Sequence, residues 1–293
     1  MRLPVTSYPA GGPKELYLAG YKQWLGQQAI TPNTLRVYHS RIKQFLNFLE
    51  YGNLSDPSID DPESLKRAMR LYLDFLKKAK RGNVTINANI NALKNFSQFL
   101  GLAETELKRE RRYRKAAKLL SIDEQKTFLR SVEQQESPRD RALALTLLYT
   151  GLRIGDCARL NIGDLAAGIT CICLPNEAKL PLNDLTSNAM RQWLEARQKL
   201  PGAEAASALW VTNDGQRLSI SGITFVVKRI GWEAKLTVSA ELLRRTCLAN
   251  AHNNLDRKEL ASRFGGYMSS ATFNRFGMPL PLNSAAVSEA AIG

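Results

Sequence analysis

The sequence predicts a mainly α-helical protein of two domains, with one small β-hairpin in the second domain. Apolar residues recur at intervals of three and four through most of the chain, which is the spacing of amphipathic helices. The chain has 293 residues, and a single domain usually holds about 100–200 residues. A strongly basic stretch, TELKRERRYRKAAK, lies between the two halves. Together these observations favour two helical domains joined by a basic linker.

Charge and cysteine content restrict the function. The chain contains 41 Lys and Arg residues against 27 Asp and Glu residues, which gives a formal net charge of +14. Such a charge favours a polyanionic partner over a small neutral metabolite. The four cysteines are scattered and there are only two histidines, so we expect neither a disulfide framework nor a bound metal or cofactor.

The expected location follows from hydropathy. No apolar run approaches the about 20 residues that a membrane-spanning helix needs. The N-terminal stretch MRLPVTSYPAGGP also lacks the apolar region of a signal peptide. We therefore expect a cytoplasmic protein with no membrane partner.

Four amphipathic helices are predicted between Lys14 and Leu100. A Thr-Pro pair at 31–32 opens the second helix, because proline is favoured in the first helical turn. The stretch SDPSIDDPES separates the second helix from the third, and Gly82 interrupts the chain before the fourth. These helices make up the predicted N-terminal domain, residues 1–104.

The basic stretch at 105–118 is the predicted linker, with seven basic residues against two acidic ones. An isolated charge run is usually a solvated face. Here the run joins two basic halves, which favours contact with phosphate groups. The residues expected to make this contact are Lys108, Arg109, Arg111, Arg112 and Arg114.

The second domain, residues 119–277, contains further helices and one hairpin. Ser121, followed three residues later by Glu124, is typical of a capping box at a helix start. The run from Arg139 to Thr150 is nearly all apolar after its first turn, which predicts a buried helix that Gly151 ends. The alternating segment 169–182 predicts a hairpin with Pro-Asn at its turn. Other helices are predicted at 184–199, 220–230, 239–252 and 256–264, followed by a tail at 278–293.

Two motifs resemble those of the tyrosine recombinase, or phage integrase, family. In that family a buried helix ends in T-G-L-R and a carboxylate follows three residues later, as TLLYTGLRIGDCARL has with Arg153 and Asp156. The segment VSAELLRRT lies where the family has H-x-L-R-H-T, so that Arg244 matches the second arginine. The paired segments TPNTLRVYHSRIKQFLNFL and NVTINANINALKNFSQFL are similar to the family's N-terminal domain.

The resemblance covers residues 16–276 and implies a fold and a partner. The implied fold is a helical, SAM-like core-binding domain followed by an α-rich domain of the catalytic type. The implied partner is double-stranded DNA, which such proteins hold in a clamp. Family members exchange a C-terminal segment between protomers, so the resemblance also implies a homo-oligomer on DNA or a partner recombinase.

The chain departs from the family at the reacting groups. Strand cleavage needs a tyrosine nucleophile, two arginines for the phosphate oxygens, and a lysine and histidines for proton transfer. The family tyrosine position is occupied by Arg275 or Phe276, so no catalytic residue is assigned and DNA cleavage is not expected. The positions that differ from the family pattern are Glu241, Arg245, Gly266, Arg275 and Phe276.

A phosphate-binding site is nevertheless implied by the residues that match. A carboxylate at Glu241 would repel a phosphate unless an arginine neutralises it, and Arg244 or Arg245 is positioned to do so. Lys179 corresponds either to the family's hairpin lysine or to a later basic position. The implied phosphate-binding residues are Arg153, Asp156, Lys179, Arg244 and Arg245.

Groove contacts are expected in the first domain. The helix that begins near residue 83 carries short amides and hydroxyls beside a lysine, which suits base reading, although the same side chains could cap and solvate the helix. The residues assigned to DNA contact are Thr34, Arg36, Arg41, Asn83, Thr85, Asn87, Asn89 and Lys94.

Three functions remain open. The favoured one is a nucleoid-associated, DNA-binding accessory or regulator of recombination or of a mobile element. The second is an active recombinase with an atypical active site that uses Tyr267, the only tyrosine after Tyr149. The third is a helical interaction protein that binds another polyanion.

Overall fold

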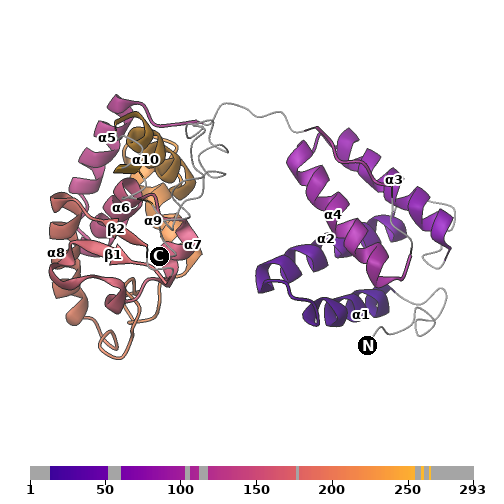
Figure 1. Cartoon of the computed structure of the whole chain (residues 1–293), viewed down its shortest axis with the longest axis horizontal. Coiled ribbons are helices and arrows are strands. Elements are labelled where there is room, and N and C mark those ends of the chain that lie inside the picture. The colour runs from indigo at the N-terminus through magenta and orange to yellow at the C-terminus, as the bar shows by residue number, and fades with distance from the viewer. Residues whose placement is uncertain are drawn as a thin grey trace, which may run out of the picture. The chain divides into compact units, whose positions relative to one another are not determined.

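The computed structural model describes residues 14–51, 61–102, 106–111, 118–175, 178–254, 259–260 and 264. The described part of the chain is mainly helical and contains one two-stranded antiparallel sheet (Figure 1). The mainly α-helical fold class is therefore confirmed. The chain divides into two compact units, Met1–Arg114 and Lys115–Gly293.

The first unit contains four helices packed around aromatic side chains. Tyr21 and Phe96 are buried with their rings edge to face at 5.2 Å, and Phe45 contacts Tyr72 at 5.4 Å. Asp61 caps the third helix by accepting a hydrogen bond from the amide of Ser64 at 2.8 Å. The helices are α1 (Lys14–Gly26), α2 (Pro32–Tyr51), α3 (Pro62–Lys78) and α4 (Asn83–Phe99).

The second unit is built around one buried helix. Most side chains of α6 are buried, and α6 contacts α5, α8, α9 and α10. The predicted capping box is confirmed, because the side chain of each of Ser121 and Glu124 accepts a hydrogen bond from the backbone amide of the other. The helices are α5 (Ile122–Glu133), α6 (Pro138–Thr150), α7 (Ile154–Arg159), α8 (Asp184–Gln198), α9 (Ile220–Glu233) and α10 (Ala240–Asn254).

The predicted hairpin is present but short. Strands β1 (Cys171–Cys173) and β2 (Lys179–Pro181) pair antiparallel, with buried Ile172 opposite buried Leu180. The features that were not predicted include the six-residue helix α7 and a bridge between Val211 and Arg217. A helix of six residues spans fewer than two turns, so it leaves no periodic pattern to detect.

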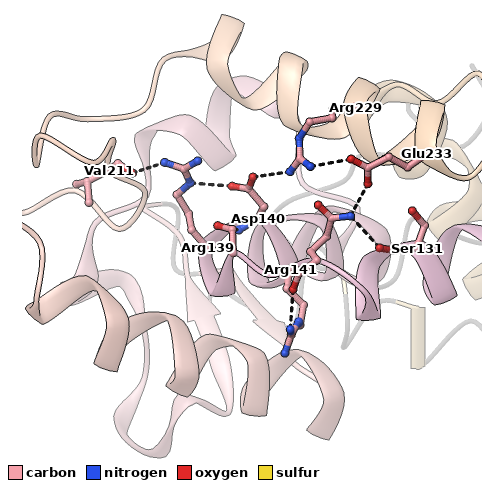
Figure 2. Close-up of polar contacts among 9 residues, drawn as sticks. Ser131, Arg139, Asp140, Arg141, Val211, Arg229 and Glu233 are labelled. Atoms are coloured by element: carbon pink, nitrogen blue, oxygen red, sulfur yellow. Dashed lines mark hydrogen bonds and ion pairs between the residues drawn. The ribbon is translucent and has the colours of Figure 1, made fainter.

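A chain of polar contacts braces α9 against α6 (Figure 2). The carboxylate of Asp140, 7 % exposed, accepts bonds from Arg139 and Arg229 at 2.8 Å each. Arg229 also pairs with Glu233 at 2.8 Å, and Glu233 accepts a bond from Gln135 at 2.6 Å. These bonds connect the ends of α5, α6 and α9, and they are polar contacts that hydrophobic periodicity does not reveal.

Within the described ranges, no helix is both long and apolar enough to cross a bilayer.

Candidate functional site

The loop between α6 and α7 presents the first arginine of the candidate site. Gly151 adopts a positive φ of 64°, a conformation that suits glycine and lets the chain turn sharply at the end of α6. The next residue, Leu152, is completely buried and anchors the loop in the core. Arg153 then stands at the start of α7 with its side chain 51 % exposed. The buried leucine therefore aims the arginine outward.

Asp156 orients basic groups around α7. Its carboxylate forms an ion pair with Arg153 at 3.7 Å and a second ion pair with Arg159. Because the Asp156 side chain is only 22 % exposed, these pairs are less screened than surface pairs. Asp156 thus keeps the Arg153 guanidinium near the start of α7, and its supporting role at a phosphate site stays a prediction.

Arg217 secures the other end of α7. Its Nη1 donates to the carbonyl oxygens of Ala158 and Leu160 at 3.0 Å each, and its Nη2 donates to Asn161 at 2.6 Å. A cation at a helix C-terminus is favourable because the last carbonyls carry partial negative charge. This residue was not predicted from the sequence. The Asp-Gly pair at 214–215 indicates a tight turn before it, but nothing in the sequence indicates the partner 57 residues away.

Arg244 joins the second motif to the first. This α10 residue is 2 % exposed, and its Nη1 donates a hydrogen bond to the carbonyl oxygen of Gly151. A buried guanidinium is costly unless it is hydrogen-bonded, and the C-terminal end of α6 is a favourable place for a cation. The structure thus brings Arg244 to the loop that carries Arg153.

Arg245 pairs with the carboxylate of Glu241, the residue that the motif resemblance aligns with a family histidine. Its Nε lies 3.2 Å from Oε1 of Glu241, one turn earlier on α10. Of the two arginines considered for this role, the structure therefore pairs Glu241 with Arg245. The side chains are 35 % and 50 % exposed, so the pair contributes only about 0.3–0.5 kcal/mol.

Lys179 lies at the start of β2, opposite Cys173 in the register of the hairpin. Its side chain is exposed. Burial raises the pKa of the neighbouring Cys171 thiol and the contact with Cys173 adds to the rise, whereas the charge of Lys179 opposes it. A role for Lys179 at the phosphate site stays a prediction.

Residues 106–111, called the strap below, dock on the first unit although they fall within the predicted linker. Three asparagines spaced four residues apart on α4 hold the strap. Asn83 donates to the carbonyl of Arg111 at 2.7 Å, and Asn91 accepts from the side chain of Arg109 at 3.0 Å. Between them, Asn87 makes two bonds to the backbone of Glu110, at 2.8 and 2.7 Å.

Two further contacts complete the docking. Leu107 is buried in the core of the first unit, and Lys77 of α3 pairs with Glu110 at 2.8 Å. The Glu110 contact raises the pKa of Lys77. The strap is therefore attached by apolar, polar and ionic contacts, and it leaves Lys108, Arg109 and Arg111 with exposed side chains.

The interpretation that two asparagines read base edges in the groove of a duplex needs correction. Asn87 and Asn89 are each 2 % exposed. Both ends of the Asn87 amide bind Glu110, and Asn89 donates to the carbonyl of Thr85 at 2.9 Å. Asn83 is likewise engaged by the strap. These side chains organise the protein itself, because short amides on a helix can bind a neighbouring backbone as well as a base edge.

The other predicted contact residues of the first unit lie on α2 and α4. Thr34 sits in the first turn of α2, where its amide donates to the hydroxyl of Thr31 at 3.2 Å. Arg36 donates to Asn33 at 2.9 Å. Arg41 and Lys94 are half-buried, and Thr85 is exposed.

Several predicted positions lie outside the described residues. They include the C-terminal positions predicted to depart from the family pattern, the alternative nucleophile, two basic linker residues and the tail at 278–293. The residues concerned are Gly266, Tyr267, Arg275, Phe276, Arg112 and Arg114. Most of the predicted helix at 256–264 also lies outside the described residues.

Among the described residues, no group of three or more His, Cys, Asp or Glu side chains could hold a metal ion.

Two family models match the chain. The model described as "Phage integrase family" matches residues 118–276, and the model described as "Phage integrase, N-terminal SAM-like domain" matches residues 18–104. The chain is 26 % identical over 231 residues to "Tyrosine recombinase XerC" of Herpetosiphon aurantiacus, covering 73 % of this chain and 72 % of the relative. It is 25 % identical over 248 residues to "TnP I resolvase" of Bacillus thuringiensis, covering 79 % and 84 %.

Solved structures share the fold. The XerH site-specific recombinase bound to difH substrate in a pre-cleavage complex matches with a TM-score of 0.69 and 17 % identity, covering 99 % of each chain. The Tn1549 transposon integrase in complex with circular intermediate DNA matches with a TM-score of 0.67 and 17 % identity, covering 94 % of this chain and 98 % of the other. At these identities the likeness concerns the fold alone.

Proposed function

Because the chain belongs to the phage integrase family, we propose that it binds double-stranded DNA and holds one backbone phosphate at the site formed by Arg153 and Arg244. The observation that carries this proposal is the hydrogen bond from Arg244 to Gly151. It links α10 to the loop that presents Arg153, which supports the proposal that both arginines contribute to one site. Relatives of the chain are named as recombinases and a resolvase, which supports a role in DNA recombination.

The proposed phosphate site works by charge and orientation. A guanidinium forms charge-assisted hydrogen bonds to phosphate oxygens, each worth about 1.5–3 kcal/mol. Arg153 is half-exposed and held by Asp156, so little side-chain freedom is lost when a phosphate binds. Such contacts add affinity in the ground state and need no reaction.

The strap is the proposed second DNA contact. It presents Lys108, Arg109 and Arg111 in a fixed order along α4. Prior fixation of a basic segment lowers the entropy lost on binding. With a net charge of +14, we expect binding that depends strongly on salt, because each neutralised phosphate releases counterions.

The protein is proposed to lack strand cleavage. The family nucleophile position holds Arg275 or Phe276, and neither side chain offers a hydroxyl group. Glu241 and Arg245 replace two groups of the proton-transfer relay, and the ion pair between them is structural. The protein would then act as an accessory or regulator of recombination or of a mobile element, as an oligomer on DNA or beside an active recombinase.

An active recombinase is the alternative, since Tyr267 is the only tyrosine in the sequence after Tyr149 and the relatives carry recombinase names. A covalent trap decides between the two. Duplexes that the protein selects from a random pool are nicked to make suicide substrates, and adducts are sought by denaturing electrophoresis. We expect tight non-covalent binding and no adduct. An adduct that forms with the wild type and disappears in Tyr267→Phe would establish the active recombinase instead.

A further inference from the structure

The first unit contains a cleft of about 760 Å³ between α2, α3 and the start of α4. This volume lies within the range of small-molecule sites, about 300–1,000 Å³. Aromatic side chains of α2 and α3 and two arginines are among the residues that line the cleft. No carboxylate occurs among the described residues that line it. The cleft is therefore aromatic and positively charged.

The aromatic part presents an exposed ring. Phe75 is 50 % exposed although it packs at 5.2 Å from Phe48, and it is nearly parallel to Tyr72, with 21° between the rings. Tyr72 is 3 % exposed and supports Phe75 from the core side. A supported, half-exposed ring is a suitable platform for stacking another flat ring.

The two arginines lie close to the same aromatic group. Burial raises the pKa of the Tyr72 phenol, and the charges of Arg41 and Arg81 oppose this rise. Arg41 comes from α2 and Arg81 from the turn before α4. Two guanidinium groups that line one cleft, with no carboxylate among the described lining residues, favour an anionic ligand.

Two polar atoms among the lining residues have no hydrogen-bond partner within the described structure. They are an acceptor, Oδ1 of Asn89, and a donor, Nε of Arg41. An unpaired buried polar group costs about 1–3 kcal/mol. Both atoms are covered by the protein in this structure and belong to residues that line the cleft. The ligand that suits them best has both a donor and an acceptor on one edge.

We propose that this cleft binds a nucleotide, with its base stacked on Phe75 and its phosphate near Arg81. A base has a flat ring and an edge that carries donors and acceptors, whereas a neutral apolar ligand would leave both arginines unmatched. The source is either a free nucleotide or an unpaired nucleotide of a bound DNA strand. The second source rests on the proposed DNA-binding function and extends it, because the cleft then selects DNA with an unstacked base.

Duplex probes that differ at one position test the proposal in the full-length protein. One duplex is fully paired, and the other carries a single unpaired nucleotide at its centre. We expect the wild type to bind the second duplex more tightly than the first. Phe75→Ala should lower the affinity for the second duplex about tenfold, as expected when the stacking of one base is lost. Phe75→Leu keeps apolar packing on Phe48 and should show the same loss. Phe225→Ala, a change at another exposed aromatic residue, should have no effect.

Competition with deoxyadenosine monophosphate separates the two sources. If the free nucleotide displaces the duplex that carries the unpaired nucleotide, and if Phe75→Leu weakens this displacement, the site accepts free nucleotides. A Phe75-dependent preference for the unpaired duplex without displacement identifies the DNA strand as the source. Equal binding of the two duplexes by the wild type, with no nucleotide competition, would overturn the proposal. Equal losses on both duplexes in Phe75→Leu would overturn it as well, since the cleft would then belong to the duplex interface.

Failure of this proposal differs from failure of the proposed function. If the wild type does not bind the fully paired duplex, the proposed DNA-binding function is wrong. If it binds that duplex with the expected salt dependence but shows no preference for an unpaired base, only the nucleotide cleft is wrong.

Discussion

Arg244 donates a hydrogen bond from Nη1 to the carbonyl oxygen of Gly151, a residue 93 positions earlier in the chain. This bond joins the two arginine motifs, because Gly151 ends α6 and Arg153 follows two residues later. The two arginines nevertheless differ in environment. Arg244 is buried, whereas half of the Arg153 side chain is exposed, so their substitutions should have separable effects.

Arg244→Ala should lower both stability and DNA affinity. The change leaves the Gly151 carbonyl without this donor and opens space in the core, which costs about 1–3 kcal/mol of unfolding free energy. Affinity for duplex DNA should fall about tenfold or more, as expected when one charge-assisted hydrogen bond to a phosphate is removed. Urea denaturation and fluorescence anisotropy measure the two effects. Arg153→Ala is the matched variant and should lose affinity while stability changes by less than about 0.5 kcal/mol. Unchanged affinity in Arg153→Ala would contradict the phosphate site.

Substitution of Asp140 should destabilise the second unit. Asp140→Ala leaves Arg139 and Arg229 without their shared carboxylate (Figure 2). Because those arginine side chains are 18 % and 33 % exposed, we expect a loss of about 2–3 kcal/mol, below the about 3–5 kcal/mol of a fully buried pair. Glu63→Ala, which breaks the surface pair with Lys66, should cost less than about 0.5 kcal/mol in urea denaturation. A loss in Asp140→Ala as small as that expected for Glu63→Ala would show that the polar contacts of Asp140 do not stabilise the second unit.

Asn87→Ala should release the strap without removing any basic side chain. Loss of both bonds to Glu110 exposes its amide to solvent, so hydrogen exchange at Glu110 should accelerate about tenfold. Duplex affinity should fall about threefold for all sequences alike, because a mobile strap loses more entropy on binding. Asn87→Asp keeps the acceptor for the Glu110 amide and should retain more protection than Asn87→Ala.

Gln98→Ala is the control for the strap, since Gln98 is exposed on the same helix. Gln98→Ala should alter neither hydrogen exchange at the Glu110 amide nor the affinity for duplex DNA. If Asn87→Ala changed sequence preference instead of overall affinity, Asn87 would be a base-reading residue in the bound state and the strap interpretation would be wrong.

The salt dependence of binding should identify the strap as a phosphate contact. If at least six phosphates are neutralised, the slope of log K against log salt concentration should be about −5 or steeper. Simultaneous substitution of Lys108, Arg109 and Arg111 by alanine should reduce the slope by roughly 0.9 for each phosphate that is no longer neutralised. A control triple variant removes the same charge from exposed positions elsewhere, at Arg67, Lys199 and Lys228. Equal slopes in the two triple variants would show that only net charge matters.

The sequence by itself determined the fold class, most helices and the two arginine motifs. Helices such as α3 and α5 carry apolar residues at helical spacing and capping residues at their starts, and these are local signals. The T-G-L-R pattern likewise predicted where α6 ends, because only a few residue types suit a positive φ.

Tertiary structure decided which polar side chains meet. Periodicity predicts the buried face of a helix, but it does not say that Asn87 binds a strap 23 residues later, or that Arg217 secures α7. The N–H groups of asparagine and arginine side chains can donate to a backbone carbonyl, to a base or to an anionic oxygen. Their partners are selected by long-range packing of the whole chain, and the residue types alone leave that selection open.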